Sequence, residues 1–155
     1  MECLDVQDVK QVEIAQLMTP PHANPAGNVH GGTIMKIIDE AAFIVASRHT
    51  RKNCVTASVD RISFLTPVYI GDVVFAMAEI NYVGGKSMEI GVRVESESLK
   101  TGKRRQVASA YLTFVALDED NQPVSIKKIE PVTDEEIRRY EEAKARYLRR
   151  KNLQK

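Results

Sequence analysis

The strongest hydrophobic pattern in the chain has a helical period and covers Gly32 to Ser47. Isoleucine, alanine and valine recur there at spacings of three and four, with further apolar residues between them. An ordinary surface helix has one apolar stripe, whereas this segment is apolar around nearly its whole circumference. The pattern therefore predicts a long helix that is buried on nearly all sides.

Four later segments have the length and apolar content of strands and are separated by short turns. In the first of them, alternation predicts Val55, Ala57 and Val59 on one face, with Thr56 and Ser58 on the other. The four segments are CVTASVDRISF (54–64), DVVFAMAEINYV (72–83), KSMEIGVRVESES (86–98) and QVASAYLTFVAL (106–117). Short connections between consecutive strands favour an antiparallel sheet.

The two ends of the chain are less apolar. The first 18 residues are amphipathic, with a spacing that fits either a helix or a strand, and the proline-rich segment 19–28 is expected to be a loop. Near the other end, Thr133 and Glu136 form a predicted capping box that opens a polar helix with a thin apolar stripe.

Together these elements predict an α+β fold in which an antiparallel sheet wraps around one long central helix. A chain of 155 residues can bury the core of a single domain. We expect that domain to cover residues 1–132, with a helical extension at 133–155. Four long strands leave exposed sheet edges, which favours edge-to-edge dimerisation.

Composition narrows the possible partners. A formal net charge of +1 gives no general attraction to nucleic acid or to an anionic membrane. No segment approaches the roughly 20 apolar residues of a membrane span, and the first residues lack the apolar block of a signal peptide. Cys3 and Cys54 lie far apart and form no Cys/His ligand cluster. We therefore expect a cytoplasmic protein without a metal site.

Asp39 is the most unusual residue of the apolar helix. A carboxylate is costly to bury without a partner, so it is either a structural acid with a neighbouring partner or a catalytic group. Gly31 and Gly32, at the start of the helix, allow close approach of a ligand, and free N–H groups there suit an oxyanion. Because seven residues correspond to about 10 Å of helix, Asp39 and these N–H groups can act on one carbonyl only from two subunits.

Six motifs resemble the hotdog-fold acyl-CoA thioesterases, in particular the cytosolic (brain-type) acyl-CoA hydrolase and the bacterial YciA group. They are AN (23–24), GNVHGG (27–32), DEAA (39–42), VTASVD (55–60), IGD (70–72) and KSMEIGVRVE (86–95), and they occur in the order of that family. The resemblance implies hydrolysis of a fatty acyl-CoA to free acid and CoA, with no metal and no prosthetic group. It also implies dimers with shared sites that associate further, as a trimer of dimers.

The resemblance implies a catalytic pair formed by Asn24 and Asp39. Asp39 acts as a general base on water, or attacks directly through a mixed anhydride, and Asn24 positions the water or the carbonyl. Asn28 is an alternative to Asn24. His30 is an alternative base, although we expect it to shape the loop that precedes Gly31 and Gly32. Thr56 and Ser58 are candidates to line the site near the thioester.

The phosphates of CoA favour arginine or lysine at a strand or loop end. The candidates for CoA binding are Arg61, Gly84, Gly85, Lys86, Ser87 and Arg93. The sequence GGKS at 84–87 is only part of a nucleotide-binding motif and lies between strands, so we interpret it as a hairpin turn.

Two other functions stay open. One is a catalytically silent acyl-CoA-binding protein. The other is a hotdog hydratase or dehydratase, which usually pairs a histidine with an acid, but His30 lies too near the start of the helix to share one carbonyl with Asp39 of the same chain. An acyl-CoA sensor that binds DNA is disfavoured, because about 20 residues before the loop are too few for a helix-turn-helix.

Overall fold

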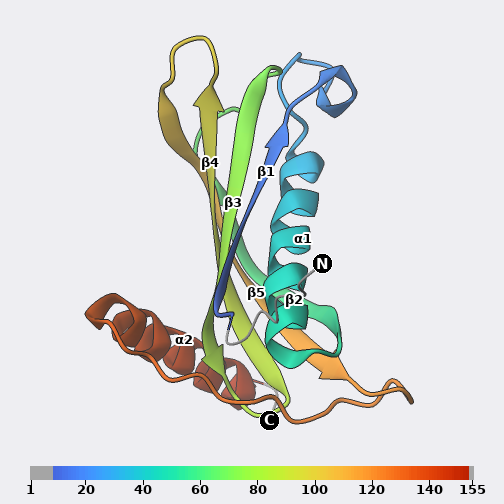
Figure 1. Cartoon of the computed structure of the whole chain (residues 1–155), viewed down its shortest axis with the longest axis vertical. Coiled ribbons are helices and arrows are strands. Elements are labelled where there is room, and N and C mark those ends of the chain that lie inside the picture. Colours follow the sequence, from blue (N-terminus) through green and yellow to red (C-terminus); the bar gives the residue numbers. More distant parts are fainter. Residues whose placement is uncertain (1–8, 154–155) are drawn as a thin grey trace, which may run out of the picture.

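The protein is described here by a computed structural model that covers residues 9–153, so Cys3 lies outside the described residues. Figure 1 shows a long helix and a second helix with a sheet between them. The helix and the four later strands confirm the sequence prediction, and the ambiguous N-terminal segment forms a fifth strand. The elements are β1 (Gln11–Leu17), the 3-10 helix η1 (Pro20–His22), α1 (Gly31–Thr50), β2 (Asn53–Phe64), β3 (Asp72–Val83), β4 (Ser87–Ser98), β5 (Arg104–Leu117) and α2 (Asp134–Leu153).

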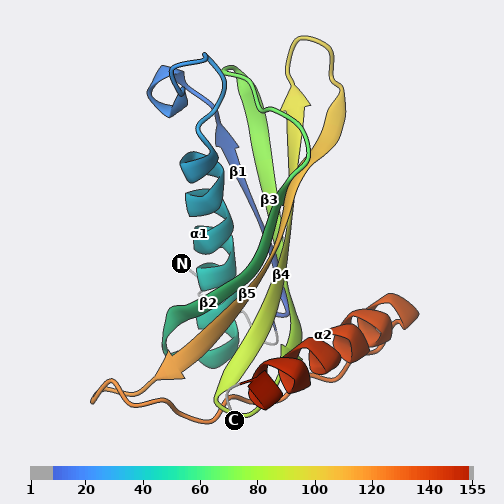
Figure 2. The same ribbon diagram turned by 180° about the vertical axis from the view of Figure 1, so that it is seen from behind.

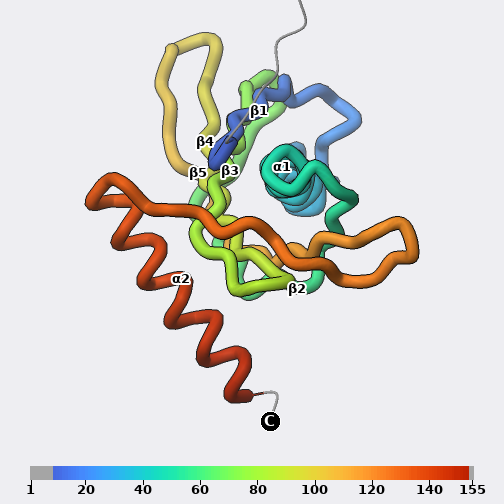
Figure 3. Tube along the Cα trace, turned by 60° about the horizontal axis from the view of Figure 1, so that its bottom comes forward, coloured from blue at the N-terminus to red at the C-terminus, as the bar shows by residue number. Residues whose placement is uncertain are grey.

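The five strands form one antiparallel sheet in the order β1-β3-β4-β5-β2, with β1 and β2 at its edges. The sheet is strongly twisted and curls around α1, which lies along its concave face (Figures 1 and 3). The helix α2 lies on the opposite, outer face (Figure 2). This arrangement confirms the predicted sheet wrapped around a central helix.

One side of α1 packs against the concave face of the sheet, but the other side stays open. Met35 and Phe43 are 46% and 43% exposed, and Asp39, one helical turn from each, is half-buried between them. The prediction of a helix buried on nearly all sides is therefore wrong for a single chain, because five curled strands cover only part of its circumference. The buried residues of α1 are Ile34, Ile37, Ile38, Ala41, Ala42, Val45 and Ala46.

Two β-bulges interrupt the alternation of β2. Thr56 pairs with Phe114 and Val59 with Leu112, whose side chains are buried on the concave face, whereas Ser58 pairs with Thr113 on the outer face. Directly opposed residues share a face, so Thr56 and Ser58 point to opposite sides of the sheet. Their predicted common face is wrong because each bulge inserts one extra residue and reverses the alternation.

The C-terminal helix begins with the predicted capping box. The N–H of Glu136 donates to Oγ1 of Thr133 at 3.1 Å, and the N–H of Thr133 donates to Oε2 of Glu136 at 3.2 Å. The connection from β5 to α2 crosses the end of the sheet, where the N–H of Ile126 donates to the carbonyl of Gly85 at 2.7 Å. A domain limit between residues 132 and 133 stays a prediction.

Candidate active site

Asp39 and Thr56 meet beside the open side of α1. Oγ1 of Thr56 donates a hydrogen bond to Oδ1 of Asp39 at 2.6 Å. Thr56 pairs with Phe114, whose side chain is buried on the concave face, so the Thr56 side chain lies on that face as well. The structural interpretation of Asp39 requires a neighbouring partner, and Thr56 is one. However, no other hydrogen bond reaches this carboxylate from residues 9–153, so Oδ2 is available to a ligand.

Asn24 is held in a tight loop by its own side chain. Its Oδ1 accepts hydrogen bonds from the N–H groups of Ala26 at 3.0 Å and Asn28 at 3.2 Å, while its own N–H donates to the carbonyl of Asn28 at 2.7 Å. Gly27 has a positive φ of 87°, which suits glycine at this turn. These contacts fix the orientation of the amide. Its NH₂ group has no acceptor within the described chain, so Asn24 offers a hydrogen-bond donor to a ligand.

His30 caps the start of α1. Its Nδ1 accepts a hydrogen bond from the N–H of Gly32 at 3.0 Å, so a neutral His30 ring carries its proton on Nε2 and has no free lone pair for a base. The N–H of Gly32 is therefore already used, contrary to the predicted pair of free glycine donors. The N–H of Gly31 has no acceptor among residues 9–153 and is the remaining donor at this helix start.

A cavity of about 320 Å³ lies between the Asn24 loop and the end of β2. Asn24, Asn28 and Gly31 border it on one side, and the rest of its lining is mainly apolar: Val29, Ile34, Phe64, Leu65, Thr66, Pro67, Val68 and Val107. Asp39 and Thr56 do not line it. Asn24 and Asp39 of one chain therefore do not line the same cavity. This separation agrees with the prediction from the distance between Asp39 and the start of the helix.

Phe64 is a residue of this cavity that sequence analysis missed. It is 54% exposed, and a Cβ placed on Gly31 would lie 3.7 Å from its ring. Phe64 thus covers the glycine whose N–H is free. The sequence offers no signal for this contact, because an aromatic residue at the end of a strand has no pattern that separates a ligand contact from a core position.

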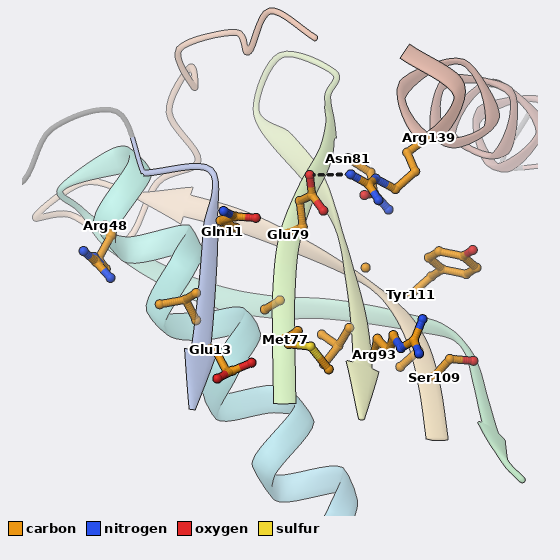
Figure 4. A pocket seen from close by; sticks show the side chains of 15 residues that line it. Gln11, Glu13, Arg48, Met77, Glu79, Asn81, Arg93, Ser109, Tyr111 and Arg139 are labelled. Carbon is orange, nitrogen blue, oxygen red and sulfur yellow. Dashed lines mark hydrogen bonds and ion pairs between the residues drawn. The ribbon is translucent and has the colours of Figure 1, made fainter. Parts of the chain in front are cut away.

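The six candidates for CoA binding do not form one cluster. Arg61 is exposed and donates through Nε to Oγ of Ser63 at 3.2 Å. Arg93 pairs with Glu95, with Nη2 2.7 Å from Oε1, and borders a groove of about 760 Å³ on the outer face of the sheet (Figure 4).

The remaining four candidates, residues 84–87, form the β3–β4 hairpin turn. The N–H of Gly84 donates to the carbonyl of Ser87 at 2.9 Å, which confirms the turn. The hydroxyl of Tyr147, on α2, donates to the carbonyl of Gly84 at 3.2 Å. This hairpin is therefore tied to α2, and none of its residues lines the groove beside Arg93.

Residues 9–153 contain no group of three or more His, Cys, Asp or Glu side chains that could hold a metal ion. No helix among these residues is long and apolar enough to span a membrane.

Comparison with known sequences identifies the Thioesterase superfamily and several relatives, two of which are named acyl-CoA thioester hydrolases. The profile of the Thioesterase superfamily matches residues 26–103. Protein VdlD of Helicobacter pylori is 37% identical over 150 residues, covering 97% of this chain and 83% of that protein. The uncharacterized acyl-CoA thioester hydrolase YkhA of Bacillus subtilis is 39% identical over 150 residues, covering 97% and 85%. The cytosolic acyl coenzyme A thioester hydrolase of Rattus norvegicus is 39% identical over 143 residues, which are 91% of this chain and 38% of the relative.

Solved structures agree with the sequence comparison. An apo-hexameric acyl-CoA thioesterase superimposes with a TM-score of 0.88 at 37% identity, covering 92% of both chains. The acyl-CoA hydrolase of Staphylococcus aureus, in complex with butyryl coenzyme A, coenzyme A and coenzyme A disulfide, gives 0.84 at 35% identity, covering 93% and 88%. Three further structures of the S. aureus enzyme carry alanine in place of an asparagine, an aspartate or a threonine.

The profile covers half of the chain, and two relatives above 30% identity are covered over most of their length. The resemblance to acyl-CoA thioesterases is thereby confirmed, and the chain belongs to the thioesterase superfamily.

Proposed function

We propose that this protein hydrolyses acyl-CoA thioesters to a free acid and CoA. One observation carries the assignment of its site. The asparagine, aspartate and threonine replaced in the S. aureus enzyme are spaced by fifteen and then seventeen residues. Asn24, Asp39 and Thr56 have the same residue types at the same two spacings. The hydrogen bond from Thr56 to Asp39 links two of the three.

The proposed site is shared between two subunits. Asp39 lies between the exposed side chains of Met35 and Phe43, beside the edge strand β2, where Val59 on the same concave face is 45% exposed. A second copy of the chain is the proposed occupant of this apolar face, since burial of such a surface is favourable. In that dimer, Asp39 faces Asn24 of the partner subunit. The hexameric relatives support a trimer of such dimers.

In the proposed mechanism, Thr56 holds Oδ1 of Asp39 while Oδ2 accepts a proton from water. The water oxygen attacks the thioester carbonyl carbon, and the resulting oxyanion accepts hydrogen bonds from the NH₂ group of Asn24 and the N–H of Gly31, both on the partner chain. The C–S bond then breaks, and the thiolate of CoA takes the proton from Asp39.

A covalent route uses the same residues. Asp39 attacks the carbonyl carbon directly, CoA leaves as a thiol after protonation by water, and water then hydrolyses the mixed anhydride. Oxygen-18 water under single-turnover conditions tests the general-base route. Label incorporated into Asp39 would reject that route, because it never bonds the water oxygen to the carboxylate carbon.

The two ends of the substrate are assigned to different surfaces. The 320 Å³ cavity beside Gly31 is proposed to take the carbons next to the thioester, because Phe64, Ile34 and Val107 give it an apolar wall. The basic candidates Arg61, Lys86 and Arg93 stay predictions for the phosphates of CoA. The proposal needs no cofactor besides the CoA of the substrate. The name of the rat relative supports a cytoplasmic location.

Release of CoA tests the proposal directly. A thiol reagent would detect CoA released from palmitoyl-, butyryl- or acetyl-CoA, and we expect release from at least one of them. Tight acyl-CoA binding without release would favour a silent binding protein. Addition of water to an enoyl-CoA, again without release of CoA, would favour a hydratase.

A further inference from the structure

The helix α2 is tied to successive strands on the outer face of the sheet. Nη2 of Arg139 lies 2.8 Å from Oε1 of Glu79 on β3, which Figure 4 shows at the rim of the outer groove. Further along α2, Nη2 of Arg146 lies 2.7 Å from Oε1 of Glu89 on β4. Contacts at two strands fix the direction of the helix across the sheet.

Glu89 is the main anchor of α2. Its side chain is fully buried, and Arg146 donates to both of its carboxylate oxygens. The Arg146 guanidinium also stacks on the ring of Tyr111 on β5, 4.0 Å from its centroid. Leaving a buried carboxylate without its partner strongly destabilises the folded protein. Detachment of Arg146 from Glu89 is therefore costly, and these contacts hold α2 on the sheet.

The last contact of α2 reaches the edge strand β2. Nη1 of Arg150 lies 2.6 Å from Oδ2 of Asp60, and the same nitrogen is 3.5 Å from Oε2 of Glu89. Both Arg150 and Asp60 side chains are about three-quarters covered, with 25% and 22% exposed. Arg150 thus connects the buried anchor on β4 to the strand that carries Thr56.

Asp60 lies in the second β-bulge of β2. It is the extra residue of the second bulge, since Val59 pairs with Leu112 and Arg61 with Tyr111 on β5. Within the described sheet, β5 is the only strand beside β2, so the ladder alone leaves Asp60 without an opposite residue. The position of a bulge decides which side chains face which side of the sheet. If the bulge moves along the strand by one residue, the side chain that it passes turns to the opposite face.

We propose that α2 acts as a strap that fixes the bulged segment of β2 and thereby keeps Thr56 on Asp39. Arg150 and Asp60 are positioning residues in this account, because neither reaches the proposed reacting atoms. Loosening their contact lets the bulges of β2 shift, and the Thr56 hydroxyl then spends less time on Oδ1 of Asp39. The catalytic part of this inference rests on the proposed thioesterase function.

The decisive comparison is Arg150→Gln against Arg149→Gln. Both variants remove one positive charge from the same turn, but Arg149 is exposed and makes no ion pair within the described chain. We expect Arg150→Gln to lower kcat about tenfold with little change in KM, because small misplacements of catalytic groups are costly. Arg149→Gln should match the wild type, and Arg150→Lys should recover part of kcat.

Hydrogen exchange supplies a readout that does not depend on activity. Backbone amides of residues 56–61 should exchange faster in Arg150→Gln than in Arg149→Gln. Asp60→Asn, which breaks the contact from the other side, should give the same increase, and the double variant should be no worse than either single one.

Two results would overturn the strap. One is a raised KM with unchanged kcat in Arg150→Gln, which would make Arg150 a CoA-binding residue. The other is equal exchange in the Arg150 and Arg149 variants. If the wild type released no CoA from any substrate, the proposed function would fail, while the exchange comparison would still decide whether α2 fixes β2.

Discussion

Thr56, on the edge strand, donates a hydrogen bond of 2.6 Å to Asp39, which lies seventeen positions earlier in the chain on the central helix. This contact sets the orientation of the carboxylate and leaves its second oxygen free. A β-bulge follows Thr56 directly, and because of it both Thr56 and Val59 lie on the concave face of the sheet, which simple alternation would not allow. The catalytic geometry is thus built into the backbone of β2.

Removal of the Thr56 hydroxyl should lower turnover. Thr56→Val keeps the branched shape but leaves Asp39 without its donor. A hydrogen bond to a charged group contributes about 1.5–3 kcal/mol, so we expect kcat to fall roughly 10- to 100-fold. Thr56→Ser, which keeps the hydroxyl, should retain most activity. Steady-state kinetics on one acyl-CoA would check the series. Equal rates for Thr56→Val and Thr56→Ser would contradict the assigned role.

The two ends of the Asn24 amide have separate roles. Asn24→Asp keeps the oxygen that holds the loop but removes the NH₂ donor. If that donor stabilises the oxyanion, kcat should fall by about 10²–10³ while the thermal unfolding midpoint changes little. Asn53→Asp is the matched control, because Asn53 is exposed at the start of β2 and does not line the cavity. A fully active Asn24→Asp variant would show that the donor plays no part.

Phe64 should limit the length of the acyl chain. Phe64→Ala removes a ring from the wall of the 320 Å³ cavity, and we expect the ratio of kcat/KM for palmitoyl-CoA to that for butyryl-CoA to rise about tenfold. Leu99→Ala, which removes another exposed apolar side chain, should leave the ratio unchanged. The same ratio in wild type and Phe64→Ala would place the acyl chain elsewhere.

Cys54 should make folding sensitive to alkaline pH. Burial raises the pKa of its thiol above the ordinary value of 9.0, and this effect outweighs the hydrogen bond with Thr50. Above pH 9.0 the unfolded chain therefore loses this proton first, so stability falls as pH rises towards the folded pKa. Urea unfolding from pH 8 to 11 should show a smaller loss of stability in Cys54→Ala. Parallel curves for the two proteins would refute this contribution.

The sequence predicted the helices and strands more accurately than the bulges and side-chain contacts within them. Periodicity identified the central helix and the four later strands because each buries a regular face. The bulges of β2 were not predictable, since Ala57 and Asp60 have no feature that marks an inserted residue. The capping role of His30 was likewise hidden, because a histidine before two glycines fits a base, a cap or a ligand contact.

The position of Asp39 shows most clearly what a hydrophobic pattern does not predict. Its apolar neighbours predict burial, yet in one chain it lies on the open side of α1 between Met35 and Phe43. A sequence pattern records that a face is apolar but does not say whether the same chain or a second copy covers it. Asn24 was identified through the family resemblance, since an asparagine before a proline is otherwise an ordinary turn residue.

Mixed oligomers test the shared site most directly. Asp39→Ala and Asn24→Ala protomers should each be inactive alone, because every site then lacks one member of the pair. After denaturation together and refolding at equal amounts, half of the dimers are mixed and each contains one intact site, so about a quarter of wild-type turnover should return. If refolded mixtures contain mixed dimers by mass spectrometry and still show no turnover, the two residues do not meet across the subunit interface.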